Sequence, residues 1–244
     1  MIELRNLTKR FGNVVAVNEL TLSVPPREIF GFIGPNGAGK TTTLRMMGGV
    51  LAPTKGSVII DGLAMDKNPE DAKRRIGFIP DRPFLYEKLT GMDFLRFTAD
   101  LYGIEDGLFR KKSEELLKQF SLWDWGNELI ESYSHGMKQR LIISAALLHD
   151  PKVIVVDEPM VGLDPAGIRM VKDLLRDLSK RGTTIFMYTH TLAVAEDVCH
   201  RIGIIHKGHL IATGTIEELM HQAQLQEGDL EEVFLILTEE KLSL

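Results

Sequence analysis

Residues 34–41 read Gly34-Pro35-Asn36-Gly37-Ala38-Gly39-Lys40-Thr41, and they lie between an apolar run at 29–33 and a helix-forming run at 41–50. The spacing fits the pattern G-x-x-x-x-G-K-[ST], in which glycines let backbone N–H groups curl around phosphates and the helix start adds its positive dipole end. We predict that Lys40 contacts the β- and γ-phosphates of a nucleotide and that Thr41 places its hydroxyl on Mg²⁺. The predicted nucleotide contacts are Gly34, Pro35, Asn36, Gly37, Ala38, Gly39, Lys40, Thr41 and Thr42.

A second polar signal follows a predicted strand farther along the chain. Residues 153–156 are four consecutive β-branched residues, and they run directly into Asp157 and Glu158. A strand-end aspartate can hold Mg²⁺, and a neighbouring glutamate can orient or deprotonate an attacking water. Asp-Glu after a strand can also be an ordinary polar exit, but its place after the phosphate-binding loop favours the catalytic interpretation. We predict Asp157 as a metal ligand and Glu158 as the catalytic base.

The two ends of the chain mix strand and helix signals. Residues 2–24 alternate polar and apolar side chains in places, and residues 58–60 lead into the turn Asp61-Gly62, which favours an antiparallel sheet packed on a parallel core. After residue 150 the predicted features are strands at 153–156, 184–188 and 202–206, a hairpin turn at 207–208, a helix from Asp164-Pro165, a short helix capped by Thr215 and Glu218, and a terminal helix carrying Leu230, Val233, Phe234 and Leu237.

The middle of the chain is different, because residues 90–149 read as almost entirely helical. Thr90 and Asp93 form a capping-box pattern at the start. Residues 103–107 separate the first helix from the next, which is predicted at 108–120. We interpret 90–149 as a helical subdomain inserted into a catalytic core that comprises residues 1–89, which include the antiparallel part, and residues 150–221. Residues 222–244 then form a C-terminal helical tail, and the whole chain is one domain.

Composition excludes several classes of protein. The chain has 244 residues, enough for one substantial core, and its net charge of −5 argues against a nucleic-acid partner. The single cysteine, Cys199, excludes a disulfide framework and a cysteine-built zinc site. The longest strongly apolar run, 141–148, is far short of the roughly 20 residues that span a bilayer. These features are typical of a cytoplasmic protein.

Four further segments indicate a specific family. Residues 133–140, Tyr-Ser-His-Gly-Met-Lys-Gln-Arg, resemble the signature motif of ABC-type ATPases. Gly162-Leu163-Asp164 resembles the family's D-loop, Thr189-His190 resembles the switch histidine, and Phe11-Gly12 resembles the aromatic platform for adenine. With the phosphate-binding loop and Asp157-Glu158 they occur in the family's order. The chain thus resembles the ATP-binding subunit of an ABC transporter.

This resemblance implies an α/β fold with a P-loop NTPase (RecA-like) core, an antiparallel β subdomain and the inserted helical subdomain. It also implies a head-to-tail dimer, formed by two copies or by a paired ATPase subunit, that sandwiches two ATP molecules with Mg²⁺. Ser134 and Gly136 would touch the γ-phosphate held by the other subunit, and Asp164 would lie at the same interface. His190 would sense the γ-phosphate, and Phe11 would stack on adenine.

The chain departs from the family's pattern at three positions. His135 stands where the signature motif usually has glycine, although Gly136 is present. Asp81 stands where the family's lid glutamine is expected. An aspartate is shorter and anionic beside a triphosphate, so it would act only through water or the metal. Val161 replaces a residue that is commonly small and polar. The role of Asp81 in nucleotide and metal binding therefore stays open, as does the role of His135.

The resemblance further implies that hydrolysis drives transport through separate membrane permease subunits, with this chain peripheral on the cytoplasmic face of the membrane. The groove near residues 80–89 would receive a short permease helix, and Phe84, Leu85 and Tyr86 either line that groove or pack the subdomain. The non-glycine signature, Asp81 and the tail favour export over import. A soluble ABC ATPase acting on ribosomes or DNA is the alternative, and an inactive regulatory subunit is disfavoured by the intact motifs.

Overall fold

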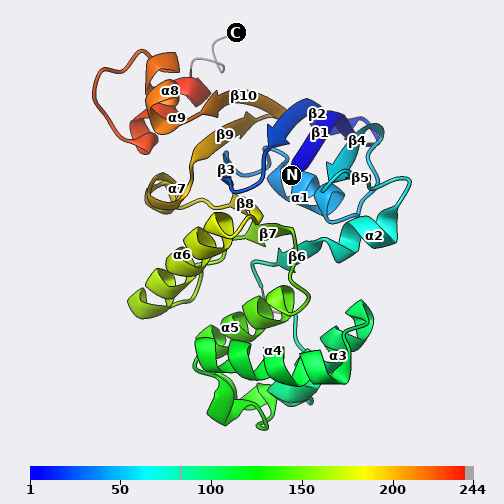
Figure 1. The fold of residues 1–244 in the computed structure, drawn as a ribbon. Helices are drawn as coiled ribbons and strands as arrows, with labels where there is room; N and C mark the ends of the chain where they lie inside the picture. Colours follow the sequence, from blue (N-terminus) through cyan, green and yellow to red (C-terminus); the bar gives the residue numbers. More distant parts are fainter. Residues whose placement is uncertain (83, 240–244) are drawn as a thin grey trace.

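In the computed structural model, which describes residues 1–82 and 84–239, the chain forms two sheets flanked by helices (Figure 1). An antiparallel sheet has the strand order β2-β1-β4-β5, and a larger sheet has the order β10-β9-β3-β8-β7-β6. Within the larger sheet the neighbours from β9 to β6 pair in parallel, and β10 pairs antiparallel to β9. The strands are β1 (Ile2–Phe11), β2 (Val14–Val24), β3 (Ile29–Ile33), β4 (Lys55–Ile60), β5 (Leu63–Ala64), β6 (Ile76–Ile79), β7 (Val153–Asp157), β8 (Thr184–Tyr188), β9 (Arg201–His206) and β10 (His209–Gly214).

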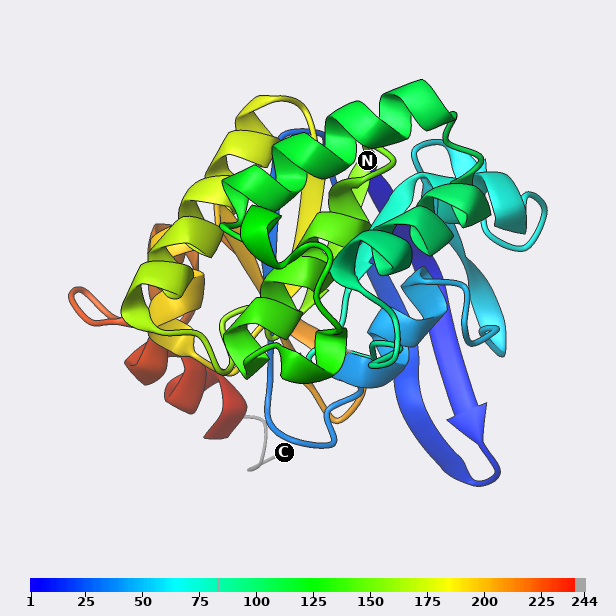
Figure 2. The same cartoon turned by 90° about the horizontal axis from the view of Figure 1, so that it is seen from below.

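Helices pack on the larger sheet, and three of them, α3, α4 and α5, form a layer below it in Figure 1. Figure 2 shows α3, α4 and α5 in front of the strands, with α6 beside them. The β1–β2 hairpin extends away from the C-terminal helices. The helices are α1 (Lys40–Met47), α2 (Pro69–Arg74), α3 (Gly91–Tyr102), α4 (Asp106–Gln119), α5 (His135–Leu147), α6 (Pro165–Lys180), α7 (Leu192–Val198), α8 (Ile216–Gln222) and α9 (Leu230–Glu239).

The expected fold class is confirmed, and several local predictions hold in detail. Thr90 and Thr215 each form a complete capping box, and Asp164 caps α6 ahead of a proline. The helix predicted at 41–50 ends earlier, at Met47, because Gly48 and Gly49 follow and Gly49 has a positive φ of 64°. The helix predicted at 108–120 begins at Asp106. The last five residues of the predicted tail, 240–244, lie outside the described residues.

Three clusters of buried apolar side chains hold these layers together. One lies between α1 and the strands of both sheets, and it includes Phe30, Phe32 and Phe186. A second joins α3, α4 and α5 to the opposite face of β7 and β8. The third places α8 and α9 on β9, β10 and α7, with Leu230 and Val233 fully buried, so the predicted apolar face of the terminal helix packs on its own domain.

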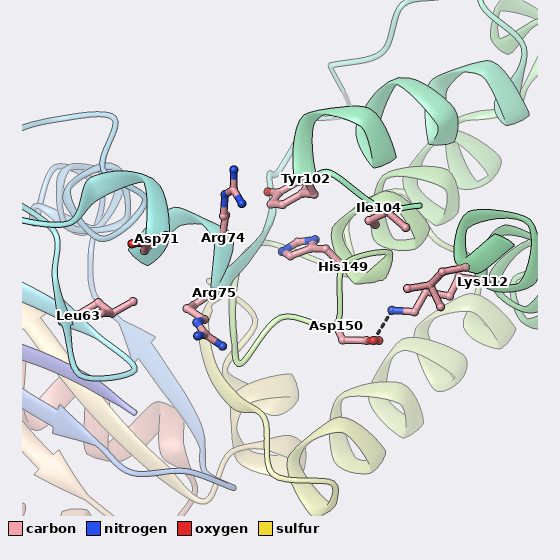
Figure 3. A pocket seen from close by; sticks show the side chains of 10 residues that line it. Leu63, Asp71, Arg74, Arg75, Tyr102, Ile104, Lys112, His149 and Asp150 are labelled. Carbon is pink, nitrogen blue, oxygen red and sulfur yellow. Dashed lines mark hydrogen bonds and ion pairs between the residues drawn. The ribbon is translucent and has the colours of Figure 1, made fainter. Parts of the chain in front are cut away.

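A ring stack joins the end of α3 to the core. Tyr102 and His149 stack with their ring centroids 3.7 Å apart, and Nε2 of His149 lies 3.0 Å from the carbonyl oxygen of Ile76 in β6. Lys112 in α4 pairs with Asp150 beside them. Figure 3 shows Tyr102, Lys112, His149 and Asp150 at a cavity of about 590 Å³ between α2 and the helical layer.

We expect this contact to make stability depend on pH. Burial lowers the pKa of His149, so the unfolded chain binds the proton more readily than the folded chain does. The stabilisation is therefore fully present above the ordinary histidine pKa of about 6.5 and is lost as the pH falls below it. Melting temperatures measured between pH 8 and 5 should fall less steeply for His149→Gln than for the natural chain. His221→Gln, on an exposed helix surface, is the control, and equal slopes would contradict the assignment.

Candidate functional site

The candidate site lies where the parallel strands of the larger sheet end. β3 runs into the phosphate-binding loop, β6 into Asp81, β7 into Glu158, and β8 into His190. Because the carboxyl ends of parallel strands meet at one edge of a sheet, residues far apart in the sequence come together there. A cavity of about 630 Å³ opens at this edge, and its lining includes Thr41, Arg45, Asp81, Asp157, Glu158, Tyr188 and His190.

The phosphate-binding loop has the tight backbone that its glycines allow. Gly39 precedes α1 with a φ of 106°, a conformation that favours glycine. A Cβ on Gly34 would collide with the carbonyl oxygen of Ile205 in β9. The loop therefore lies directly against the end of the sheet, with the N–H groups at the start of α1 available to an anion.

Lys40 is turned back onto this loop. Its Nζ donates hydrogen bonds of 2.6 Å to the carbonyl oxygens of both Gly34 and Pro35, and it lies 4.9 Å from the centroid of the Tyr188 ring. Burial lowers the pKa of Lys40, while Glu158 and Asp157 act in the opposite direction. The ammonium group is thus held by carbonyl oxygens of its own loop.

Glu158 is buried and held by the segment after β8. Its carboxylate accepts hydrogen bonds from the backbone N–H of His190 at 2.7 Å, from Nδ1 of His190 at 2.6 Å and from the Thr189 hydroxyl at 3.1 Å. The backbone of Glu158 has a φ of 51°, a left-handed conformation that is uncommon for a residue with a side chain. The structure thus joins the predicted base to the predicted γ-phosphate sensor.

Asp157 fits a divalent cation. Burial raises its pKa to about 6, helped by the negative charges of Asp81 and Glu158. A cation between Asp157 and the Thr41 hydroxyl would relieve this repulsion. Within residues 1–82 and 84–239, no group of three histidines, cysteines or carboxylates is placed to hold a metal. Mg²⁺ characteristically needs only one or two carboxylates together with waters and substrate phosphates, so these residues suit it.

The remaining predicted residues lie apart from this cavity. Ser134, Gly136 and Asp164 line a second cavity of about 400 Å³, together with Gly162 of the D-loop. Ser134 caps α5 and accepts a 3.3 Å hydrogen bond from Met137 N–H, so the first N–H groups of α5 start at this cavity. Phe11, at the end of β1, is 48% exposed and lines neither cavity.

The sequence alone assigned no separate role to Tyr188, which lines the first cavity, or to Thr189, which contacts Glu158. Tyr188 is the last residue of β8, and burial with the charges of Glu158 and Asp157 raises its pKa to about 12. Thr189 is buried and bonds Glu158. Tyr188 and Thr189 are the two residues before His190. Their position at the carboxyl end of a predicted strand was the feature that could have identified them from the sequence.

The comparisons with known proteins agree on one family. A family model described as ABC transporter matches residues 17–161. The linearmycin resistance ATP-binding protein LnrL of Bacillus subtilis (strain 168) is 34% identical over 242 residues, which cover 97% of this chain and 78% of LnrL.

Two solved structures are similar to the chain. A structure of the ATP-binding subunit of an ABC transporter has a TM-score of 0.92 and 32% identity, with 97% of this chain and 99% of that chain covered. The dimeric ATP-binding cassette MJ0796, in a post-hydrolysis state bound to ADP and Pi, has a TM-score of 0.79 and 28% identity, with 88% of this chain and 98% of that chain covered.

Proposed function

The chain belongs to the ABC transporter family, and from that membership we propose which of its residues bind and hydrolyse ATP and what the hydrolysis drives. It is an ATP-binding, ATP-hydrolysing subunit of an ABC transporter. Subunits of this family dimerise and work with membrane permease subunits. The observation that carries the residue assignments is the meeting of Lys40, Asp157, Glu158 and His190 at one edge of the sheet, apart from Ser134 and Gly136.

In the proposed binding step, residues 34–42 enclose the phosphates. Lys40 leaves the two loop carbonyls and pairs with the β- and γ-phosphate oxygens, which are stronger acceptors because they are charged. Phe11 lies at the exposed end of the β1–β2 hairpin, where a planar base can stack on it. Thr41 and Asp157 would hold Mg²⁺, with Asp81 acting on the ion or nucleotide across the cavity. When bound, the ion would supply positive charge to the phosphates.

In the proposed hydrolytic step, Glu158 orients the attacking water and takes its proton. Its carboxylate already lies at the cavity, and the contacts from Thr189 and His190 limit how it can turn. The His190 side chain is 67% exposed, so it can exchange its contact with Glu158 for one with a γ-phosphate. The neighbouring residues Asp157 and Glu158 thus have different proposed roles. Asp157 would bind the metal ion, and Glu158 would activate the attacking water.

The proposed catalytic unit is a head-to-tail dimer. Each chain presents a phosphate-binding half-site at the first cavity and a signature half-site, with Ser134, Gly136 and Asp164, at the second. These half-sites share no lining residue, and we propose that two chains together complete each ATP site. Pairing with a second copy, or with a related subunit, supplies the N–H groups of α5 to a γ-phosphate.

We also propose the division of the chain into a catalytic core at 1–89 and 150–221, a helical subdomain at 90–149 and a tail from 222. Within the described part of the chain, no helix has the length and apolar character to span a membrane. A permease would dock near residues 80–89, where Phe84 is 87% and Tyr86 61% exposed, whereas Leu85 packs on the core. Residue 83 of this groove lies outside the described residues.

We propose export as the direction of transport, with the chain held on the cytoplasmic face of the membrane by its permease. The relative LnrL is a resistance protein, and resistance is commonly achieved by removing a compound from the cell. The acidic composition of the chain gives no support to a nucleic-acid partner.

Affinity purification of the full chain from its native membranes tests this function. We expect a protein with several membrane spans in about equal amount. We expect Tyr86→Asp, which lies outside the lining of the first cavity, to lose it, since a charged groove no longer accepts an apolar helix face. Leu235→Asp, at a 48% exposed apolar position on α9, is the control for adding a charge to an exposed apolar site. Ribosomal or DNA-repair proteins, or no partner, would contradict the transporter assignment.

A further inference from the structure

His135 lies between the signature turn and the D-loop. It is the exposed first residue of α5, directly after the cap Ser134. Its imidazole rests on the backbone of Gly162, because a Cβ on Gly162 would collide with both Cδ2 and Nε2 of that ring. Gly162 also has a φ of 75°, a conformation that favours glycine. The absence of a side chain therefore allows both this backbone conformation and the close contact with the His135 ring.

The D-loop joins the two cavities of the chain. Val161 lines the first cavity, of about 630 Å³, whereas Gly162, Leu163 and Asp164 line the second, of about 400 Å³. The segment is tied at one end, where Val161 N–H donates to the carbonyl oxygen of Glu158 at 3.3 Å. It is tied at the other end by Asp164, which accepts a 2.8 Å hydrogen bond from Gly167 N–H.

Gly162 lies between these two ties, in a turn that Leu163 N–H closes by donating to the carbonyl oxygen of Met160 at 3.3 Å. Leu163 approaches the signature turn too, since its Cδ2 would lie 3.8 Å from a Cβ on Gly136. The His135 ring is the side chain that touches Gly162 most closely. It therefore limits the positions that the D-loop can take between Glu158 and the signature turn.

We propose that His135 is a positioning residue for ATP-driven dimer closure. Its ring holds the D-loop in register with the signature turn. Ser134, which would engage the partner's γ-phosphate, and Glu158, which lies in the hydrolytic site of its own chain, are thereby linked through one packed contact. The proposal rests on the proposed function, because it concerns the same dimer. It assigns a role to a side chain that stands where the family usually has glycine.

A double-mutant cycle tests the contact in the full chain carrying Glu158→Gln, in which ATP should hold the dimer closed. Sedimentation with ATP gives the dimer dissociation constant. We expect His135→Ala to raise it roughly tenfold and Gly162→Ala roughly a hundredfold, since the new methyl group meets the ring. The double variant should dimerise at least as well as Gly162→Ala alone, because removing the ring makes room for the methyl group.

Three variants separate packing from other effects. Gly62→Ala places the same methyl group at a φ of 81° with no neighbour within 4 Å, so it should leave the dissociation constant unchanged. His221→Ala controls for loss of an exposed histidine. His135→Phe keeps a flat ring over Gly162 and should restore dimerisation.

Additive effects of the two substitutions, or a His135→Phe variant as weak as His135→Ala, would overturn the proposal while leaving the dimer intact. A Glu158→Gln parent that stays monomeric with ATP would instead contradict the proposed function, and the role of His135 would fall with it. Monomer affinity for ATP, measured below the dimerisation range, should be equal in all variants.

Discussion

Replacing Glu158 with glutamine will reduce the turnover number for ATP hydrolysis by roughly 100- to 10,000-fold and leave ATP bound. The glutamine amide has the same shape and can keep the contacts to Thr189 and His190, but it cannot take a proton from water. Lys40 and the phosphate-binding loop are unchanged, so nucleotide affinity is preserved. A closed dimer with ATP should accumulate, and it can be measured by sedimentation together with phosphate release.

Glu70→Gln is the matched control, because Glu70 lies on exposed α2, away from both cavities. That variant should hydrolyse ATP at the natural rate and form no lasting dimer. If Glu158→Gln itself hydrolyses ATP at the natural rate, Glu158 is not the base. If Glu158→Gln loses ATP binding, its carboxylate serves the nucleotide site in another way.

Ser134→Arg should also cause a large loss of ATP hydrolysis, but by preventing dimerisation rather than by removing the catalytic base. Ser134 caps α5 at the second cavity, and an arginine there both removes the cap and fills the space that a partner's γ-phosphate would enter. Monomer binding of ATP should be spared, since the phosphate-binding cavity shares no residue with this one. ATP-dependent dimerisation should be abolished, and the hydrolysis rate should fall at least about 100-fold, because the site then lacks the donors that the partner's signature turn would supply.

Ser23→Arg, on the exposed face of β2, provides the control for adding an arginine to the surface. Circular dichroism of Ser134→Arg establishes that the variant is folded, since loss of a cap costs only about 1 kcal/mol. ATP-dependent dimerisation equal to that of the natural chain would remove Ser134 from the shared site.

Much of the fold was predictable because its signals are local. The phosphate-binding loop, the capping boxes at Thr90 and Thr215, and the cap at Asp164 each depend on residues three or four positions apart. Strand β6 and the short helices α2 and α7 were not predicted, since β6 has only four residues and neither helix has the side-chain cap that marks α8.

The residues of the site were predictable by type, but their mutual contacts were not. The sequence places Glu158 and His190 after separate strands, 32 positions apart, and only the pairing of β7 with β8 joins them. The turn of Lys40 back onto its loop and the ring of His135 on Gly162 depend on side-chain packing across the sheet edge. Patterns of residue types do not carry that information.

The left-handed backbone of Glu158 has a consequence for the engineering of this protein. Such a conformation costs an ordinary residue roughly 1 to 2 kcal/mol, and a glycine adopts it freely. A thermostability screen that ignores turnover would therefore favour removal of the very side chain on which hydrolysis depends. At this position thermal stability and ATP hydrolysis favour different amino acids, so a selection for more stable variants must measure both properties.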